Sequence, residues 1–171
     1  MKKIYVLLFV AFGINNMVYS QEKSELSKKE QSKIDKNEKF LVVHELMNSK
    51  LWMFKIESIT TISGEVFHLE NDANYIICEE NIATFQIPAK EFVRMGQTKF
   101  IGLSELTDIT SYALDDFSNN NNIKGRIRVM SDPFPWIKLN FSVDSENNAM
   151  VEYIQSDGVN FTLSGVMKPL E

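Results

Sequence analysis

The chain has 171 residues, of which 44% are hydrophobic and 24% charged, a composition typical of one globular domain and not of a disordered chain. Its formal net charge of −5 at pH 7 argues against binding nucleic acid and against electrostatic binding to anionic lipid. A single cysteine, Cys78, excludes an internal disulfide and cannot form a zinc site by itself.

Residues 1–20 have the three parts of a secretory signal peptide. Two lysines precede an apolar run of eleven residues, Ile4–Ile14, and Ser20 provides a small side chain before a predicted cut at Gln21. The apolar run is well short of the ~20 residues that a membrane-spanning helix needs. We therefore expect an exported protein, soluble in the periplasm or outside the cell, with no transmembrane segment in the mature chain.

A charged segment follows the signal, with six lysines and five acids over Glu22–Lys39. Ser27 and Glu30 have the spacing of a capping box, and apolar residues then recur at helical spacing, which predicts a helix over Ser27–Asn48. These apolar residues are Phe40, Val42, Val43, Leu46 and Met47. The predicted organisation is a charged helical arm at 21–39 and a helix plus β domain at 40–171. The arm is either a solvated helix face, which we favour, or a tether for a partner.

From Leu51 onward the hydrophobic period changes to two, which predicts strands. The first contains Trp52–Ile56, and two more follow at Asn74–Glu79 and Ile82–Ile87. A turn at Glu80 and Asn81 pairs Cys78 with Ala83 and Ile76 with Phe85. Antiparallel partners share a face, so this register predicts that Cys78 is buried and unreactive.

The middle of the chain predicts two short strands, Lys99–Leu103 and Ile109–Leu114, joined by a loop. Asp115, Asp116 and the run Asn119–Asn122 offer oxygen ligands of the kind that calcium prefers. Their spacing matches no known calcium loop, and runs of Asn and Asp usually mark turns. We therefore assign no metal site here.

The last third predicts a meander of four strands: Ile123–Met130, Trp136–Val143, Ala149–Gln155 and Val159–Met167. The register that keeps apolar residues on one face gives two rows, Ile127–Phe141–Val151–Leu163 and Val129–Leu139–Tyr153–Phe161. In that register Tyr153 points inward and Glu152 points to solvent.

Three cations, Lys124, Arg126 and Arg128, lie on one face of the first meander strand. Alone they would suggest an anion site. The predicted register places them opposite Asp144, Ser142 and Asn140, as is typical of a solvated polar face, and we favour that interpretation.

No catalytic motif is present: the sequence lacks a nucleophile elbow, a zinc-protease helix, a phosphate loop and a dinucleotide fingerprint. The two histidines, His44 and His68, fall on different predicted elements. We therefore identify no catalytic residue, metal site or cofactor, and a non-enzyme is favoured over an enzyme whose carboxylates meet only in space.

The order of these features resembles the domain of unknown function 4251 family of exported Gram-negative bacterial proteins. The matching segments are the signal at Lys2–Ser20, the charged arm at Glu22–Lys39, the aromatic strand Trp52–Ile56, the motif Gln86–Ile87–Pro88 and the closing hairpin Ala149–Met167, with Ser156–Asp157–Gly158 at its turn and Ser164–Gly165 near its end. The resemblance covers nearly all of the mature chain. It brings no known activity and therefore no functional residues.

The predicted fold is mainly β, with an N-terminal helix followed by an antiparallel meander of about eight strands that forms a barrel or a clam-like sandwich. Such a domain could bind a small apolar or amphipathic ligand, which requires an internal cavity of ~300 Å³ or more. The alternative is an envelope interaction or scaffold protein that uses the arm and the loop Pro133–Phe134–Pro135–Trp136 as contacts. That alternative requires an exposed apolar patch around Trp136.

The signal peptide generates the first testable prediction. We expect the mature chain to begin at Gln21, because Ser20 follows a short apolar run that is typical of a cleaved signal. Intact-mass spectrometry of the periplasmic or extracellular fraction measures this directly. An uncut species that begins at Met1 and stays in the membrane fraction would contradict it.

Overall fold

The computed structural model describes residues 28–70, 73–87, 103–115, 122–132 and 135–170. Helix α2 spans Lys28–Ser49 and precedes every described strand. The strands are β1 (Leu51–Thr61), β2 (Val66–His68), β3 (Tyr75–Glu79), β4 (Ile82–Gln86), β5 (Ser104–Asp115), β6 (Asn122–Val129), β7 (Ile137–Asp144), β8 (Asn148–Gln155) and β9 (Asn160–Pro169). The predicted signal peptide, its cleavage site and Ser27 of the capping box lie outside the described residues.

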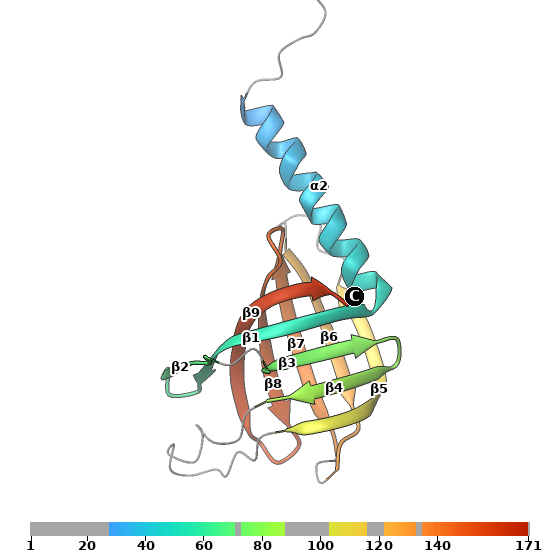
Figure 1. Cartoon of the computed structure of the whole chain (residues 1–171), viewed down its shortest axis with the longest axis vertical. Coiled ribbons are helices and arrows are strands. Elements are labelled where there is room, and N and C mark those ends of the chain that lie inside the picture. Colours follow the sequence, from blue (N-terminus) through green and yellow to red (C-terminus); the bar gives the residue numbers. More distant parts are fainter. Residues whose placement is uncertain (1–27, 71–72, 88–102, 116–121, 133–134, 171) are drawn as a thin grey trace, which may run out of the picture. The chain divides into compact units, whose positions relative to one another are not determined.

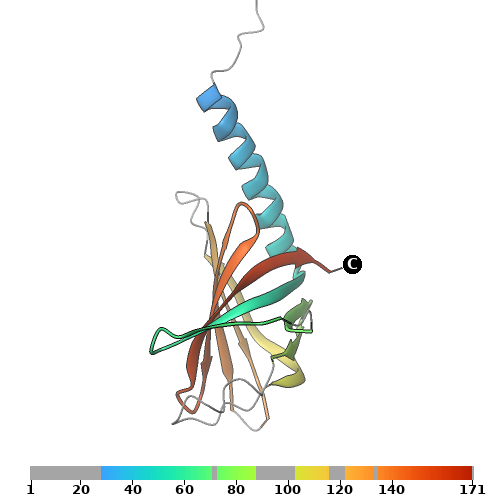
Figure 2. The ribbon, with the colours of Figure 1, turned by 60° about the vertical axis from the view of Figure 1, so that its left-hand side comes forward.

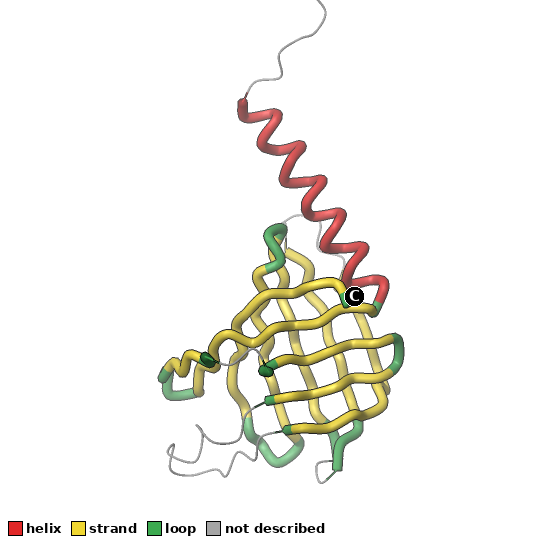
Figure 3. The backbone as a smooth tube through the Cα atoms, in the orientation of Figure 1, coloured by secondary structure: helices red, strands yellow, loops and turns green. Residues whose placement is uncertain are grey.

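The strands form a closed antiparallel barrel (Figures 1 and 3). The order of pairing is β1-β3-β4-β5-β6-β7-β8-β9, and β1 also pairs with β9, which closes an eight-stranded ring. Strand β2 pairs with the second half of β1 and stands outside that ring. The predicted mainly β fold is therefore confirmed, and of the two predicted architectures it is the barrel.

Closure depends on a bend where β1 meets β9. The register shifts between Ile56 and Ser58, so Glu57 is an extra residue opposite β9. Gly165 pairs with Ile56, and a Cβ atom on Gly165 would collide with the carbonyl oxygen of Lys55. A β-bulge bends the strand that carries it, and the missing side chain lets the two backbones approach at this bend.

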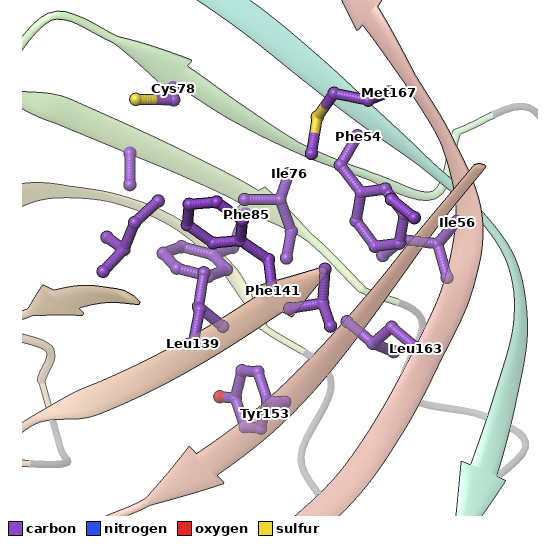
Figure 4. Packing of buried hydrophobic residues seen from close by; sticks show 14 of the residues in the cluster. Phe54, Ile56, Ile76, Cys78, Phe85, Leu139, Phe141, Tyr153, Leu163 and Met167 are labelled. Carbon is purple, nitrogen blue, oxygen red and sulfur yellow. The ribbon is translucent and has the colours of Figure 1, made fainter. Parts of the chain in front are cut away.

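The inward-facing apolar side chains of the described strands pack together inside the barrel (Figure 4). Trp52, Phe54 and Ile56 alternate along β1 as the sequence predicts, and all three are buried. On the adjacent strands β8 and β9, Tyr153 stacks on its cross-strand partner Phe161 with the ring centroids 4.4 Å apart. These contacts make one continuous apolar core that draws on every strand of the ring.

Three predicted registers are confirmed. Cys78 pairs with Ala83 across the β3–β4 turn, Leu139 pairs with Tyr153, and Tyr153 pairs with Phe161. Each of these hairpins has a short turn whose length leaves one register that keeps both partners inside the barrel.

The predicted pairing of β6 with β7 is wrong by two residues. Ile127 pairs with Leu139 instead of Phe141, and Gly125 pairs with Phe141. A two-residue shift leaves every side chain on the same face, so the hydrophobic pattern cannot detect it. The ring of Phe141 lies where a Cβ atom of residue 125 would be, so the glycine selects the observed register.

The corrected register also changes the expected partners of the basic cluster. Lys124 lies opposite Ser142, Arg126 opposite Asn140, and Arg128 opposite Lys138. All three cations are exposed on the outer face of β6, as predicted.

Two more expectations about strands are corrected. The predicted loop between two short strands does not exist, because Ser104–Asp115 forms one long strand with a register shift between Ile109 and Ser111. Polar residues at 107 and 108 interrupt the apolar pattern, so the sequence did not show that the strand is continuous. The short strand Val66–His68 was not predicted, since three residues are too few to show a period of two.

Helix α2 contains the border between two compact units, 1–35 and 36–171, and the second unit holds the barrel. All side chains from Lys28 to Lys39 are exposed, whereas Val43 and Met47 are buried in the core of the second unit. Val42, one of the apolar residues that were expected at helical spacing, is instead 65% exposed. It lies one position from Val43 along the helix and so faces a different direction.

The register of the last three strands generates the second prediction. Tyr153→Ala should lower the free energy of unfolding by ~3–5 kcal/mol, because it removes a fully buried ring and its stack on Phe161. Glu152→Ala should cost only about 1 kcal/mol, because it removes one hydrogen bond, from Asn140 Nδ2, on the outer face. Denaturant melts of both variants measure the difference, with Tyr153→Phe as the control for the hydroxyl alone. A larger loss for Glu152→Ala would contradict the assigned faces.

Candidate functional site

The C-terminal turn of α2 is fixed to one end of the barrel by a short chain of hydrogen bonds. Tyr112 donates its hydroxyl hydrogen to the carbonyl oxygen of Met47 at 2.5 Å and accepts the indole N–H of Trp52 at 3.2 Å. The Lys50 ammonium lies 5.2 Å from the centroid of the Tyr112 ring. Burial raises the pKa of the Tyr112 hydroxyl, so it stays a neutral donor. The C-terminal turn of α2 and the side chains that hold it therefore cover this end of the barrel.

A cavity lies inside the barrel, and it is very small. Its volume is ≈10 Å³, about one water-sized sphere, and its lining is apolar: Trp52, Phe54, Ile76, Leu139, Phe141, Val151 and Met167. Because an apolar void of this size offers no hydrogen bonds to water, we expect it to be dry. A ligand site of the ordinary kind needs ~300–1,000 Å³. This cavity does not hold such a ligand without rearrangement of the core.

Polar side chains gather where β8 ends, away from the helix. Gln155 donates its side-chain N–H to the Tyr153 hydroxyl at 2.8 Å, and Glu105 accepts hydrogen bonds from Ser131 Oγ and the Asp132 N–H. Thr107 donates to the carbonyl oxygen of Met130. Burial is the main cause that raises the pKa of Tyr153, so this tyrosine is not a poised base at neutral pH. The first of these bonds lies within β8, and the others connect β5 with the residues that follow β6; they do not form a catalytic pair.

The outer surface of the barrel has two different halves. Over β1, β3, β4 and β5 the outward residues form the rows Leu51–Glu79–Ile82–Asp108 and Met53–Ile77–Thr84–Leu106. Over β6 to β9 the corresponding rows include Arg126–Asn140–Glu152–Thr162 and Lys124–Ser142–Met150–Ser164. The two rows of the first half are apolar and acidic, and the next row, Lys55–Tyr75–Gln86–Ser104, is polar with one lysine. The second half is polar and mainly basic, with Glu152 as its acid.

The structure does not bring the residues considered in the sequence into one site. Cys78 is buried in the core, His44 lies on α2 beside Phe40 and Asn48, and His68 is exposed on β2. Among the residues that the structure describes, no cluster of His, Cys, Asp and Glu could hold a metal ion. Residues 116–121 of the candidate calcium segment lie outside the described residues.

Within the basic cluster, two of the three exposed cations have local partners. Arg126 forms an ion pair with Asp115 at 3.4 Å, and the Arg128 guanidinium lies 5.2 Å from the Trp136 ring centroid. Trp136 is itself only half-buried. These contacts fit the predicted solvated face and leave no anion pocket of converging cations.

Sequence reasoning missed the apolar side chains on the outer surface. Ile82, Leu106 and Met130 are all exposed although each lies in or next to a strand. The available signal was the alternation of inward and outward side chains along each strand, since all three residues stand at outward positions of that alternation. For Leu106 that signal could not be used, since its strand was predicted as a loop.

The fold has a counterpart among solved structures. A crystal structure of a DUF4251 family protein from Bacteroides eggerthii matches with a TM-score of 0.63 at 14% sequence identity, covering 77% of this chain and 87% of that chain. The chain has a DUF4251-like fold. The resemblance noted from the sequence is thus confirmed at the level of the fold.

No protein-family model matches the sequence, and no curated protein matches it. No helix in the described part of the chain has the length and apolar character needed to cross a membrane.

The buried cysteine generates the third prediction. Burial raises the pKa of the Cys78 thiol to about 12, so the native protein should resist alkylation at pH 8 while the denatured protein reacts quickly. Cys78→Ser should lower the free energy of unfolding by ~1–3 kcal/mol, because it buries a hydroxyl among apolar groups. Stopped-flow thiol labelling and a denaturant melt measure the two effects. Fast labelling of the folded chain would show that the thiol is accessible.

Proposed function

We propose that this chain is an exported β-barrel domain that acts by binding another protein through the outer surface of the barrel. This is the second of the two functions that the sequence suggested, the envelope interaction or scaffold protein. The observation that carries the proposal is the contrast, among the described residues, between a closely packed barrel core and an outer surface with large exposed apolar side chains.

The interior supports the proposal because the described core residues leave little space between them. The cavity of ≈10 Å³ compares with the ~300 Å³ expected for a binding module that holds a small apolar ligand. The surrounding core side chains, among them Phe54 and Tyr153, are fully buried. Admitting a ligand would separate packed aromatic rings, and close-packed interiors resist such a change.

The surface supports the proposal because large apolar side chains stay in contact with solvent. Leu106 on β5 is 68% exposed, and Met130, whose N–H donates to the carbonyl oxygen of Asp108 on the same strand, is 54% exposed. Single exposed apolar residues are ordinary, but several on neighbouring strands are typical of interaction surfaces. Export rests on the predicted signal peptide and completes the proposal.

Native mass spectrometry of the exported chain, purified gently from the envelope of its source cells, tests this function. We expect part of the chain in a stoichiometric complex with a second protein, and the unbound part at the mass of the polypeptide alone. The control is the same chain purified under denaturing conditions and refolded, which should have the same unbound mass.

The opposite outcome is equally clear. A small molecule of several hundred daltons bound one-to-one to the unbound chain would contradict the proposal. It would favour the ligand-binding function and require that the core opens.

A further inference from the structure

We propose that the outward face of β1, β3, β4 and β5 is a docking surface for a protein segment that carries apolar side chains flanked by lysine or arginine. We call this face the acidic apolar face and define it by Leu51, Glu79, Ile82, Leu106 and Asp108. The inference rests on the proposed function and names the surface and the partner's chemistry.

The strand registers place these residues side by side. Leu51, Glu79, Ile82 and Asp108 are successive cross-strand partners, so they form one row across four strands. Leu106 lies in the next row, opposite Thr84, and is a diagonal neighbour of Ile82. Residues of one row in an antiparallel sheet point to the same side, so the side chains form a continuous surface.

The apolar members of this face are open to solvent. Leu51 is 42% exposed, Ile82 38% and Leu106 68%. Met130, whose N–H donates to the carbonyl oxygen of Asp108, continues the row onto the neighbouring strand and is 54% exposed. Burial of large apolar side chains of this kind gives most of the affinity in protein interfaces.

The carboxylates decide which partner fits. Glu79 and Asp108 are exposed, and neither side chain forms an ion pair or hydrogen bond with the described residues. A wholly apolar partner would remove water from both carboxylates without replacing it, which is strongly unfavourable. A partner with lysine or arginine at the edge of its apolar residues pairs with both. Anionic lipid and nucleic acid are repelled by the same charges.

The other half of the barrel supplies an internal control. Met150 is 59% exposed on β8, but its row contains Lys124, Ser142 and Ser164. It therefore matches Leu106 in exposure and differs in its charged surroundings. A basic apolar partner should bind this half more weakly, because Lys124 and Arg126 repel it and Glu152 is the one acid in these two rows.

The test measures binding of a synthetic amphipathic helix made of leucine and lysine to the full exported chain by fluorescence anisotropy. We expect saturable binding that weakens with added salt. Leu106→Lys, and separately Asp108→Lys, should each weaken it about tenfold or more. Met150→Lys should leave the affinity unchanged, and a leucine–glutamate helix of the same pattern should not bind. Thermal melts of each variant verify that the fold is intact.

Several results would overturn the inference. They are no binding of the leucine–lysine helix, equal binding of the leucine–glutamate helix, or a loss in Met150→Lys as large as that in Leu106→Lys. A concentration-dependent dimer in sedimentation velocity that Leu106→Lys abolishes would show that a second copy covers this face, and would also overturn it.

These failures are distinguishable from failure of the proposed function. If the envelope complex seen by native mass spectrometry survives Leu106→Lys and Asp108→Lys, the chain binds its partner elsewhere and only this surface is wrong. A ligand in the barrel would overturn the proposed function and, with it, the claim that this face is where the protein acts.

Discussion

The pairing of β1 with β9 is the constraint on which the rest of this structure depends. It joins the first and last strands of the ring, so every ring strand has a neighbour on both sides. The extra residue Glu57 and the bare backbone of Gly165 allow the bend at which the two strands meet. Once the ring is closed, the inward residues face one another at a fixed distance and must fill the space between them.

Because the described core is closely packed, the outside of the barrel is the more favourable place for binding. Among the residues that the structure describes, the rings of Phe54, Phe141 and Tyr153 are buried inside the barrel, and the cavity lined by such residues is ≈10 Å³. On the outside, the same alternation that fills the core leaves each strand with a row of outward side chains. The rows differ across the ring, and the asymmetry between an acidic apolar half and a polar basic half is the feature that the core does not require.

Helix α2 adds a second constraint at one end of the barrel. Its buried Met47 and the hydrogen bond from Tyr112 to the Met47 carbonyl oxygen cover the apolar side chains near Trp52. The residues from Lys28 to Lys39 need no such burial and are exposed. The helix ends at Ser49, and the positive φ of 55° at Lys50 turns the chain into β1 (Figure 2).

The sequence by itself determined the fold class, the burial of Cys78 and Tyr153, and three of the four hairpin registers predicted from it, because a period of two and a short turn together leave one acceptable pairing. It could not determine the β6–β7 register, since a shift of two residues keeps all faces unchanged until the Phe141 ring meets Gly125. It also could not choose between barrel and sandwich, because closure joins Trp52 to Pro169, residues at opposite ends of the domain. The sequence could not predict the acidic apolar face for the same reason. Leu106, Ile82 and Leu51 become neighbours only when four strands lie in register, and long-range pairing of that kind leaves no local pattern in the chain.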